Sequence, residues 1–187
     1  MELYGSYTSP FVRHCRIALL QTKLKCKFVE TDATQSATLS PTKKVPLLID
    51  SELTLTDSTS ILTHIHELVG EYFLTDVEDL ELYHMSNTLL DTCVNLFMLA
   101  KFDDITPDKS IYLTRQQQRV DSGLIAVNEK TFSQALPLTD GEVRLACFLS
   151  WATFRNLFTL DKFEHLQALL TLAETDVNFK QTAPPQE

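Results

Sequence analysis

Three short motifs in the first 60 residues carry groups that can recognise a charged, peptide-like molecule. They are Ser9-Pro10-Phe11, Val45-Pro46-Leu47 and Asp57-Ser58. The first offers a hydroxyl that can donate a hydrogen bond, and the third offers a carboxylate that suits an ammonium group. The second places a proline inside an apolar run, where its missing N–H must be accommodated. Each motif is common alone, so their order and spacing are what indicate a site.

The elements predicted around these motifs follow the order β-α-β, an irregular stretch, then β-β-α. Strands are indicated at residues 1–4 and 27–30, along the continuous apolar run 45–49, and at its hairpin partner 53–55. Ser9-Pro10 is typical of a helix N-terminus, and apolar spacing continues that helix to about Lys23. Asp57-Ser58 caps a further helix, which Gly70 ends. This is the order of elements in a thioredoxin fold.

Pro46 begins the third predicted strand, so it is expected at an edge, a bend or a cis peptide bond. A cis Val45-Pro46 bond would turn the Val45 main chain toward an incoming peptide, which could pair with the Val45 N–H and C=O as an added strand does. At Asp57-Ser58 the backbone N–H groups and the helix dipole favour a carboxylate. A ligand with both charges at one end, an amide in the middle and a thiol near Ser9 fits this arrangement.

Composition and charge are those of an ordinary globular protein. Of the 187 residues, 44% are hydrophobic and 22% are charged. A chain of this length can form one large domain or two small ones. The net charge of −9 argues against a nucleic-acid partner, whose surface needs clustered Lys and Arg. Residues 1–74 carry eight acids and seven bases, whereas the rest carry 17 acids and nine bases. This break predicts two domains, residues 1–74 and 76–187.

The cysteines and histidines do not indicate a metal site. The four cysteines lack a CxxC or any metal-ligand spacing, and His64 and His66 lie two residues apart on a helix, so they point away from each other. Cys15 is expected in the core. Scattered thiols without a secretory signal favour a reducing cytosol, so a cytoplasmic protein is expected. No apolar run approaches the ~18–20 residues of a membrane span, and no membrane partner is expected.

The chain resembles the glutathione S-transferase superfamily, and within it a bacterial branch. The resemblance begins at Gly5-Ser6-Tyr7-Thr8-Ser9-Pro10-Phe11-Val12-Arg13 and continues through Pro41-Thr42-Lys43-Lys44-Val45-Pro46-Leu47-Leu48 and Leu55-Thr56-Asp57-Ser58-Thr59-Ser60-Ile61-Leu62. In the second half it is carried by Thr139-Asp140-Gly141-Glu142, Trp151-Ala152-Thr153-Phe154-Arg155 and Phe179-Lys180-Gln181-Thr182-Ala183-Pro184. It spans nearly the whole chain, although residues 100–135 match only loosely and the second half is short for the family.

The resemblance implies an α/β thioredoxin-like N-terminal domain followed by an all-α helical-bundle C-terminal domain. It implies that the chain binds glutathione, γ-glutamyl-cysteinyl-glycine, as a co-substrate without any metal, and that the protein is a homodimer active in detoxification. In this reading Ser9 activates the thiol. The remaining residues implied to bind glutathione are Phe11, Lys44, Val45, Pro46, Asp57 and Ser58. For Phe11 ordinary packing is an equal alternative, and for Lys44 the alternative is a solvated lysine.

Several positions depart from the family or carry secondary expectations. Ser40 stands where the family usually has Asn, and Lys43 where it usually has Gly, whose φ other residues resist. A serine rather than a cysteine at position 9 argues against a thiol-transfer enzyme, which needs a mixed disulfide. Arg13 is expected at the surface or at a domain interface, and residues 182–187 are expected to be a loosely packed tail.

In the second half, helices are expected over 78–101 and about 108–132, from Thr139 onward and over 166–172. Thr139 with Glu142 three residues later forms a capping box. Met98, Phe102 and Tyr112 would line a pocket for an electrophile or simply belong to the core.

The leading hypothesis from the sequence is a transferase in which the glutathione thiolate attacks a small, apolar electrophile held against the second domain. The runner-up is a non-catalytic binding or scaffold protein that kept the fold. A third reading is a glutathione-binding carrier or isomerase that uses the same site.

Overall fold

The computed structural model describes residues 1–185, which divide into two compact units. The first unit contains Met1–Thr75 together with the chain from Glu174 onward, and the second contains Asp76–Ala173. In the described residues, no helix has both the length and the apolar character needed to cross a membrane.

The first unit is built on a mixed sheet. Its strands are β1 (Glu2–Gly5), β2 (Lys27–Glu30), β3 (Leu47–Asp50) and β4 (Leu53–Leu55). Within residues 1–185 these four strands pair in the order β2-β1-β3-β4, with β1 parallel to β2 and both other pairs antiparallel. The order and direction confirm the thioredoxin-like prediction. β3 starts at Leu47, two residues later than the apolar run, because Pro46 has no N–H to donate to the ladder.

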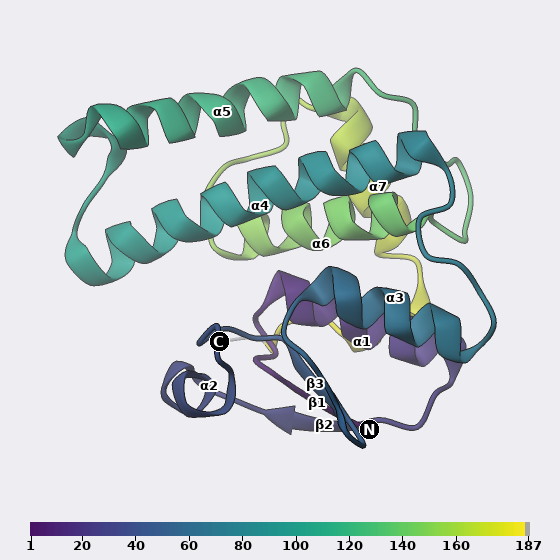
Figure 1. Ribbon diagram of the computed structural model, residues 1–187. Coiled ribbons are helices and arrows are strands. Elements are labelled where there is room, and N and C mark those ends of the chain that lie inside the picture. The colour runs from purple at the N-terminus through teal and green to yellow at the C-terminus, as the bar shows by residue number, and fades with distance from the viewer. Residues whose placement is uncertain (186–187) are drawn as a thin grey trace. The chain divides into compact units, whose positions relative to one another are not determined.

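Two helices cover one face of this sheet. α1 (Pro10–Thr22) and α3 (Ser58–Leu68) lie side by side on it, as Figure 1 shows. Their inward faces are fully buried through Val12 and Cys15 of α1 and Ile61 and Ile65 of α3, which confirms Cys15 as a core residue. The stretch between β2 and β3, predicted to be irregular, contains α2 (Ala33–Leu39), which begins with a capping box of Asp32 and Gln35.

Gly5 lets β1 approach α1 closely. A Cβ built on Gly5 would lie 2.6 Å from both methyl carbons of Val12, a side chain with no exposed surface. We therefore expect Gly5→Ala to lower the free energy of unfolding by about 1–2 kcal/mol through overpacking. Urea unfolding would measure this loss. The cost should shrink in a Val12→Ala background, which removes the two methyl groups, and an unchanged unfolding midpoint in Gly5→Ala would contradict the packing argument.

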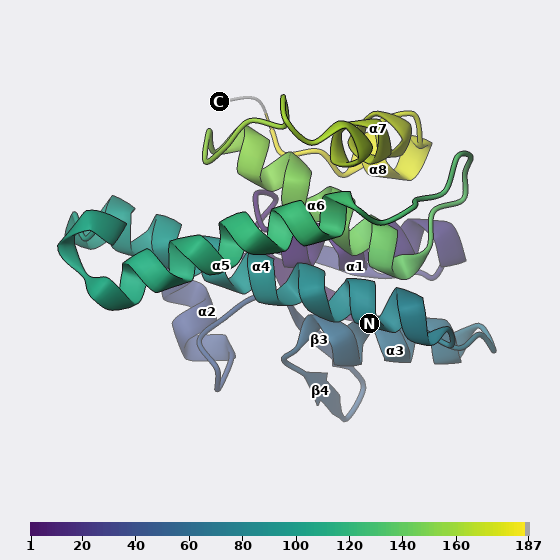
Figure 2. The same ribbon diagram turned by 90° about the horizontal axis from the view of Figure 1, so that it is seen from above.

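The second unit is helical. It contains α4 (Val77–Asp103), a short 3₁₀ helix η1 (Pro107–Lys109), α5 (Ile111–Asn128), α6 (Asp140–Phe154) and α7 (Glu164–Ala173). α5 runs back along α4, as Figures 1 and 2 both show, and α6 packs against α4 and is buried at every position from Gly141 to Leu149. The predicted capping box at the start of α6 is present, since Glu142 Oε2 accepts from the Thr139 N–H at 2.9 Å. These elements confirm the all-α second part.

The predicted loose tail, residues 182–187, is wrong for Thr182, whereas Ala183 and Pro185 are exposed and residues 186 and 187 lie outside the described part of the chain. α8 (Val177–Gln181) packs against α1, and Thr182 has no exposed surface. Arg13, expected at the surface or at a domain interface, is not at the surface: it is 4% exposed, with its guanidinium carbon 3.8 Å from the centre of the Phe179 ring and its Nη2 donating to the Phe179 carbonyl at 2.9 Å. No local pattern indicates these contacts, because they join residues more than 160 positions apart. They are why the segment from Glu174 groups with the first unit.

Candidate functional site

Strand directions bring the three motifs to one edge of the sheet. Tyr4 near the end of β1 pairs with Leu47 at the start of β3, so Val45-Pro46 lies opposite the residues that follow β1. β4 runs antiparallel to β3, with Leu55 opposite Leu48, so the connection into α3 leaves the sheet at the same edge. The topology therefore gathers the segments around Ser9, Val45-Pro46 and Asp57-Ser58, as the sequence predicted from their order.

Ser9 is the N-cap of α1. Its Oγ accepts a hydrogen bond from the Val12 N–H at 3.4 Å, and within residues 1–185 its hydroxyl proton has no acceptor. The first turn of α1 carries no acidic side chain to offset the positive end of the helix dipole. Ser9 thus offers one donor and a favourable field to an anion.

Val45 is left out of the sheet's hydrogen bonding. The Val45-Pro46 peptide bond is cis, one of the three arrangements expected for this proline, and the ladder between β1 and β3 begins only at Leu47. In the part of the chain that the structure describes, neither the N–H nor the C=O of Val45 has a main-chain partner. A short peptide could therefore pair with this residue as an added strand does.

The start of α3 combines a carboxylate with a helix N-terminus. Asp57 is the N-cap, and its Oδ1 accepts from the Thr59 N–H at 2.8 Å. The rest of this exposed carboxylate has no partner among residues 1–185, and Ser58 beside it is 5% exposed. Because the first turn of α3 also lacks acidic residues, its backbone suits a carboxylate while Asp57 suits an ammonium group.

The two remaining predicted site residues flank these groups in sequence. Phe11, two positions after Ser9, is half-buried in the first turn of α1. Lys44, directly before Val45, is exposed on the loop between α2 and β3. Both lie on segments that reach the same sheet edge.

The loop that carries Lys44 contains a strained residue. Lys43 has φ 54°, in the left-handed region that favours glycine, and its N–H donates to the Ser40 carbonyl at 2.9 Å. Ser40 is buried, and its Oγ lies 2.9 Å from the Thr42 Oγ1. The position where the family usually has glycine thus adopts the backbone angle that glycine permits most easily.

We expect Lys43→Gly to raise the free energy of unfolding by about 0.5–1 kcal/mol. Relief of the left-handed conformation, roughly 1–2 kcal/mol for a non-glycine residue, is partly offset by the entropy of the more flexible unfolded chain. Lys44→Gly is the matched control, since it removes the same charge at a residue without positive φ and should be mildly destabilising. Equal effects of the two substitutions in chemical denaturation would contradict the role of φ at Lys43.

The protein's own thiols are not placed for chemistry at this edge. Cys15, Cys93 and Cys147 are buried, and burial raises the pKa of Cys93 to about 12 and also raises that of the half-buried Cys26. Residues 1–185 contain no group of three or more His, Cys, Asp or Glu side chains that could hold a metal ion.

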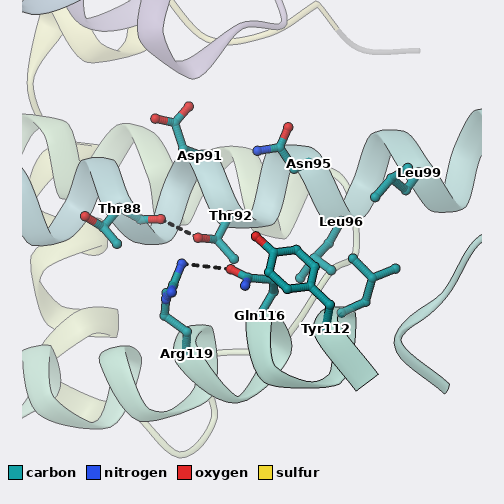
Figure 3. A pocket seen from close by; sticks show the side chains of 10 residues that line it. Thr88, Asp91, Thr92, Asn95, Leu96, Leu99, Tyr112, Gln116 and Arg119 are labelled. Carbon is teal, nitrogen blue, oxygen red and sulfur yellow. Dashed lines mark hydrogen bonds between the residues drawn. The ribbon is translucent and has the colours of Figure 1, made fainter. Parts of the chain in front are cut away.

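A groove lies within the helical unit. It is an open groove of about 520 Å³ between α4 and α5, into which Tyr112, Gln116 and Arg119 of α5 point toward α4 (Figure 3). Arg119 donates to the Gln116 Oε1 at 2.8 Å. Of the three residues weighed as a pocket lining, Tyr112 lines this groove, whereas Met98 and Phe102 do not and are 44% and 70% exposed.

Comparison with known proteins identifies the first unit. Residues 3–72 match the family described as "Glutathione S-transferase, N-terminal domain". No curated protein matches the chain in sequence.

Solved structures share the fold over nearly the whole chain. A glutathione S-transferase from Methylobacillus flagellatus KT with glutathione bound has a TM-score of 0.85 at 18% identity, covering 98% of this chain and 99% of its own. A glutathione S-transferase from Methylobacterium radiotolerans JCM 2831, in complex with glutathione sulfonate, has a TM-score of 0.82 at 20% identity. The match covers 100% of this chain and 95% of the other. A glutathione transferase family member from Pseudomonas fluorescens Pf-5, with bound S-(propanoic acid)-glutathione, has a TM-score of 0.81 at 21% identity. The match covers 98% of this chain and 99% of the other.

These matches agree with the strand order of the first unit and with the helical second unit. Residues 3–72 therefore form a glutathione S-transferase N-terminal domain, and the chain as a whole has the fold of glutathione S-transferases, a thioredoxin-like N-terminal domain followed by an all-helical part.

Proposed function

We propose that the chain binds glutathione and transfers its thiolate to a small electrophile. One observation carries the proposal: the Ser9 hydroxyl proton, which has no acceptor, the unpaired main chain of Val45 and the start of α3 all lie at one sheet edge. These groups can donate a hydrogen bond to a thiolate, pair with a peptide main chain and bind the charged end of an amino acid. The assignment extends to a cytoplasmic homodimer with a role in detoxification.

Each part of glutathione finds a matching group in this proposal. The cysteinyl N–H and C=O pair with the main chain of Val45, which Pro46 keeps out of the ladder. At the γ-glutamyl end the carboxylate receives N–H and hydroxyl groups at Ser58, and the ammonium contacts Asp57. Lys44 reaches the glycyl carboxylate, and Phe11 packs near the sulfur.

Ser9 activates the thiol without acting as a base. A free cysteine thiol has a pKa near ~8.5, and lowering it by ~2 units needs roughly 2.7 kcal/mol of differential stabilisation. One hydrogen bond to a charged group contributes about 1.5–3 kcal/mol, and a helix N-terminus adds up to about 1 kcal/mol. The thiol releases its proton to solvent, and the thiolate attacks an electrophilic carbon, forming a C–S bond while a leaving group departs with the electron pair of the bond that breaks. At an α,β-unsaturated carbonyl no group leaves: the C=C π electrons move toward the carbonyl and the adduct takes up a proton from water.

Isothermal titration with glutathione tests binding, and S-methylglutathione serves as the matched ligand without an ionisable thiol. We expect both to bind, since the main-chain and charge contacts do not involve the sulfur. A panel of electrophiles (activated aryl halides, alkyl halides and α,β-unsaturated carbonyls) then tests conjugation by product formation. Binding without thiolate formation near neutral pH would exclude the transferase and support a glutathione carrier. Absence of binding would exclude both and support a scaffold protein.

A further inference from the structure

We propose that Arg16 is a positioning residue that holds the Ser9 loop through Tyr7 and is itself held by the C-terminal segment at Thr182. The loop is the chain between the end of β1 and the start of α1, residues 6–9. This inference rests on the proposed function, because it gives Arg16 a part in thiol activation.

Tyr7 anchors the loop at its middle. Its ring packs against Phe28 of β2, with the ring centres 4.8 Å apart, and the Arg16 guanidinium carbon lies 4.7 Å from the centre of the Tyr7 ring. The neighbours of Tyr7 bond to each other, since the Thr8 N–H donates to the Ser6 Oγ at 3.2 Å. The Ser9 N–H donates to the Ser6 carbonyl at 3.1 Å, so the position of Ser9 depends on that of the loop.

Arg16 reaches the loop from within α1. Helical side chains point toward the helix N-terminus, which brings a residue in the second turn back over the segment before the helix. The guanidinium also lies 5.1 Å from the Phe28 ring centre, and Nη1 donates to the Thr182 carbonyl at 3.3 Å. Burial lowers the pKa of Arg16 from its ordinary value, with the nearby Tyr7 acting in the opposite direction. Two aromatic faces and one carbonyl thus fix the orientation of a partly desolvated cation.

The Thr182 carbonyl is held in place by its own segment. Asp176 caps α8, with its Oδ1 accepting from the N–H groups of Asn178 and Phe179 at 2.7 and 2.9 Å. The Thr182 hydroxyl lies 2.9 Å from the Asn178 carbonyl, and Arg13 Nε donates to the same hydroxyl at 3.4 Å. The segment 176–182, anchored by the buried residues Phe179 and Thr182, therefore ends on the cation that contacts Tyr7.

This contact chain is separate from the core of α1. The buried residues of the helix include Val12, Cys15 and Leu19, whereas Arg16 is only half-buried. Loss of the Arg16 side chain should therefore loosen the loop while leaving the fold and the Val45 and Asp57 contacts in place. Ser9 would then meet the sulfur less often, and the bound thiol would be harder to ionise.

The experiment compares Arg16→Ala, Arg16→Lys and Tyr7→Leu with the control Lys25→Ala, which removes an exposed cation of the same unit. The pKa of bound glutathione is read from thiolate absorbance, its Kd from titration calorimetry, and the mobility of residues 5–12 from amide hydrogen exchange. We expect Arg16→Ala and Tyr7→Leu to raise the bound-thiol pKa by about 0.5–1 unit with Kd changed less than about threefold, and to speed exchange in the loop. Arg16→Lys should recover part of the effect, and Lys25→Ala should show none.

A folded Arg16→Ala variant with unchanged loop exchange and unchanged bound-thiol pKa would overturn the inference. So would weaker binding at an unchanged thiol pKa, which would make Arg16 a ligand contact. The exchange measurement needs no ligand: if wild type fails to bind glutathione, the proposed function falls, and loop exchange alone decides whether Arg16 holds the loop.

Discussion

Replacing Ser9 with alanine is expected to raise the pKa of the glutathione thiol in the complex by about 1–2 units while leaving its affinity within about threefold. The substitution removes one hydrogen bond to a charged sulfur, worth roughly 1.5–3 kcal/mol, and none of the contacts to the tripeptide main chain. The Ser9 Oγ already accepts from the Val12 N–H, so its proton is the part of the group free to stabilise a thiolate.

Titration of thiolate absorbance against pH measures this shift, and calorimetry measures the affinity. Ser9→Thr keeps both the hydroxyl and the N-cap and should behave much like wild type. Thr34→Ala is the control, since it removes an exposed hydroxyl on α2, away from the Ser9 loop. Since loss of the N-cap also costs about 1 kcal/mol of stability, the comparison is made where every variant is folded. Equal thiol ionisation in wild type and Ser9→Ala would contradict the role of Ser9.

Asp57→Asn is expected to weaken glutathione binding by about tenfold to a hundredfold with little loss of stability. The carboxylate is proposed to accept a charged hydrogen bond from the γ-glutamyl ammonium, and such bonds contribute roughly 1.5–3 kcal/mol. Asparagine caps a helix about as well as aspartate, so the bond from the Thr59 N–H to position 57 survives the change.

A ligand without the amino group separates the charge contact from any general effect. Wild type should bind glutaryl-cysteinyl-glycine about as weakly as Asp57→Asn binds glutathione, and Asp57→Asn should hardly distinguish the two ligands. Calorimetry gives all four affinities. If both proteins lost the same factor on removal of the amino group, Asp57 would not be its partner.

Elements with strong local signals could be predicted from the sequence. Ser9-Pro10 and Asp57-Ser58 mark the starts of α1 and α3, and Thr139 with Glu142 marks that of α6, because an N-cap is a contact between neighbouring residues. A proline inside an apolar run is expected at a sheet edge, at a bend or after a cis bond, and the bond before Pro46 is cis. The same reasoning gathered the site residues at one sheet edge, whereas their roles in binding stay predictions.

What the sequence did not reveal depends on distant contacts or on a weak pattern. The capping box of Asp32 and Gln35 was a readable signal for α2, but the helix has only one buried residue, Ser36, and so no apolar periodicity. The buried place of Thr182 and Arg13 arises from pairing across more than 160 positions, which no local pattern encodes. The groove between α4 and α5 depends likewise on how two helices meet.

A crystal structure of the chain with glutathione tests the central claim most directly. We expect the tripeptide at the sheet edge, with its cysteinyl N–H and C=O paired to the main chain of Val45, its γ-glutamyl end at Asp57 and Ser58, and its sulfur within hydrogen-bonding distance of the Ser9 Oγ. An empty edge at saturating glutathione, or a tripeptide bound elsewhere with its sulfur away from Ser9, would contradict it.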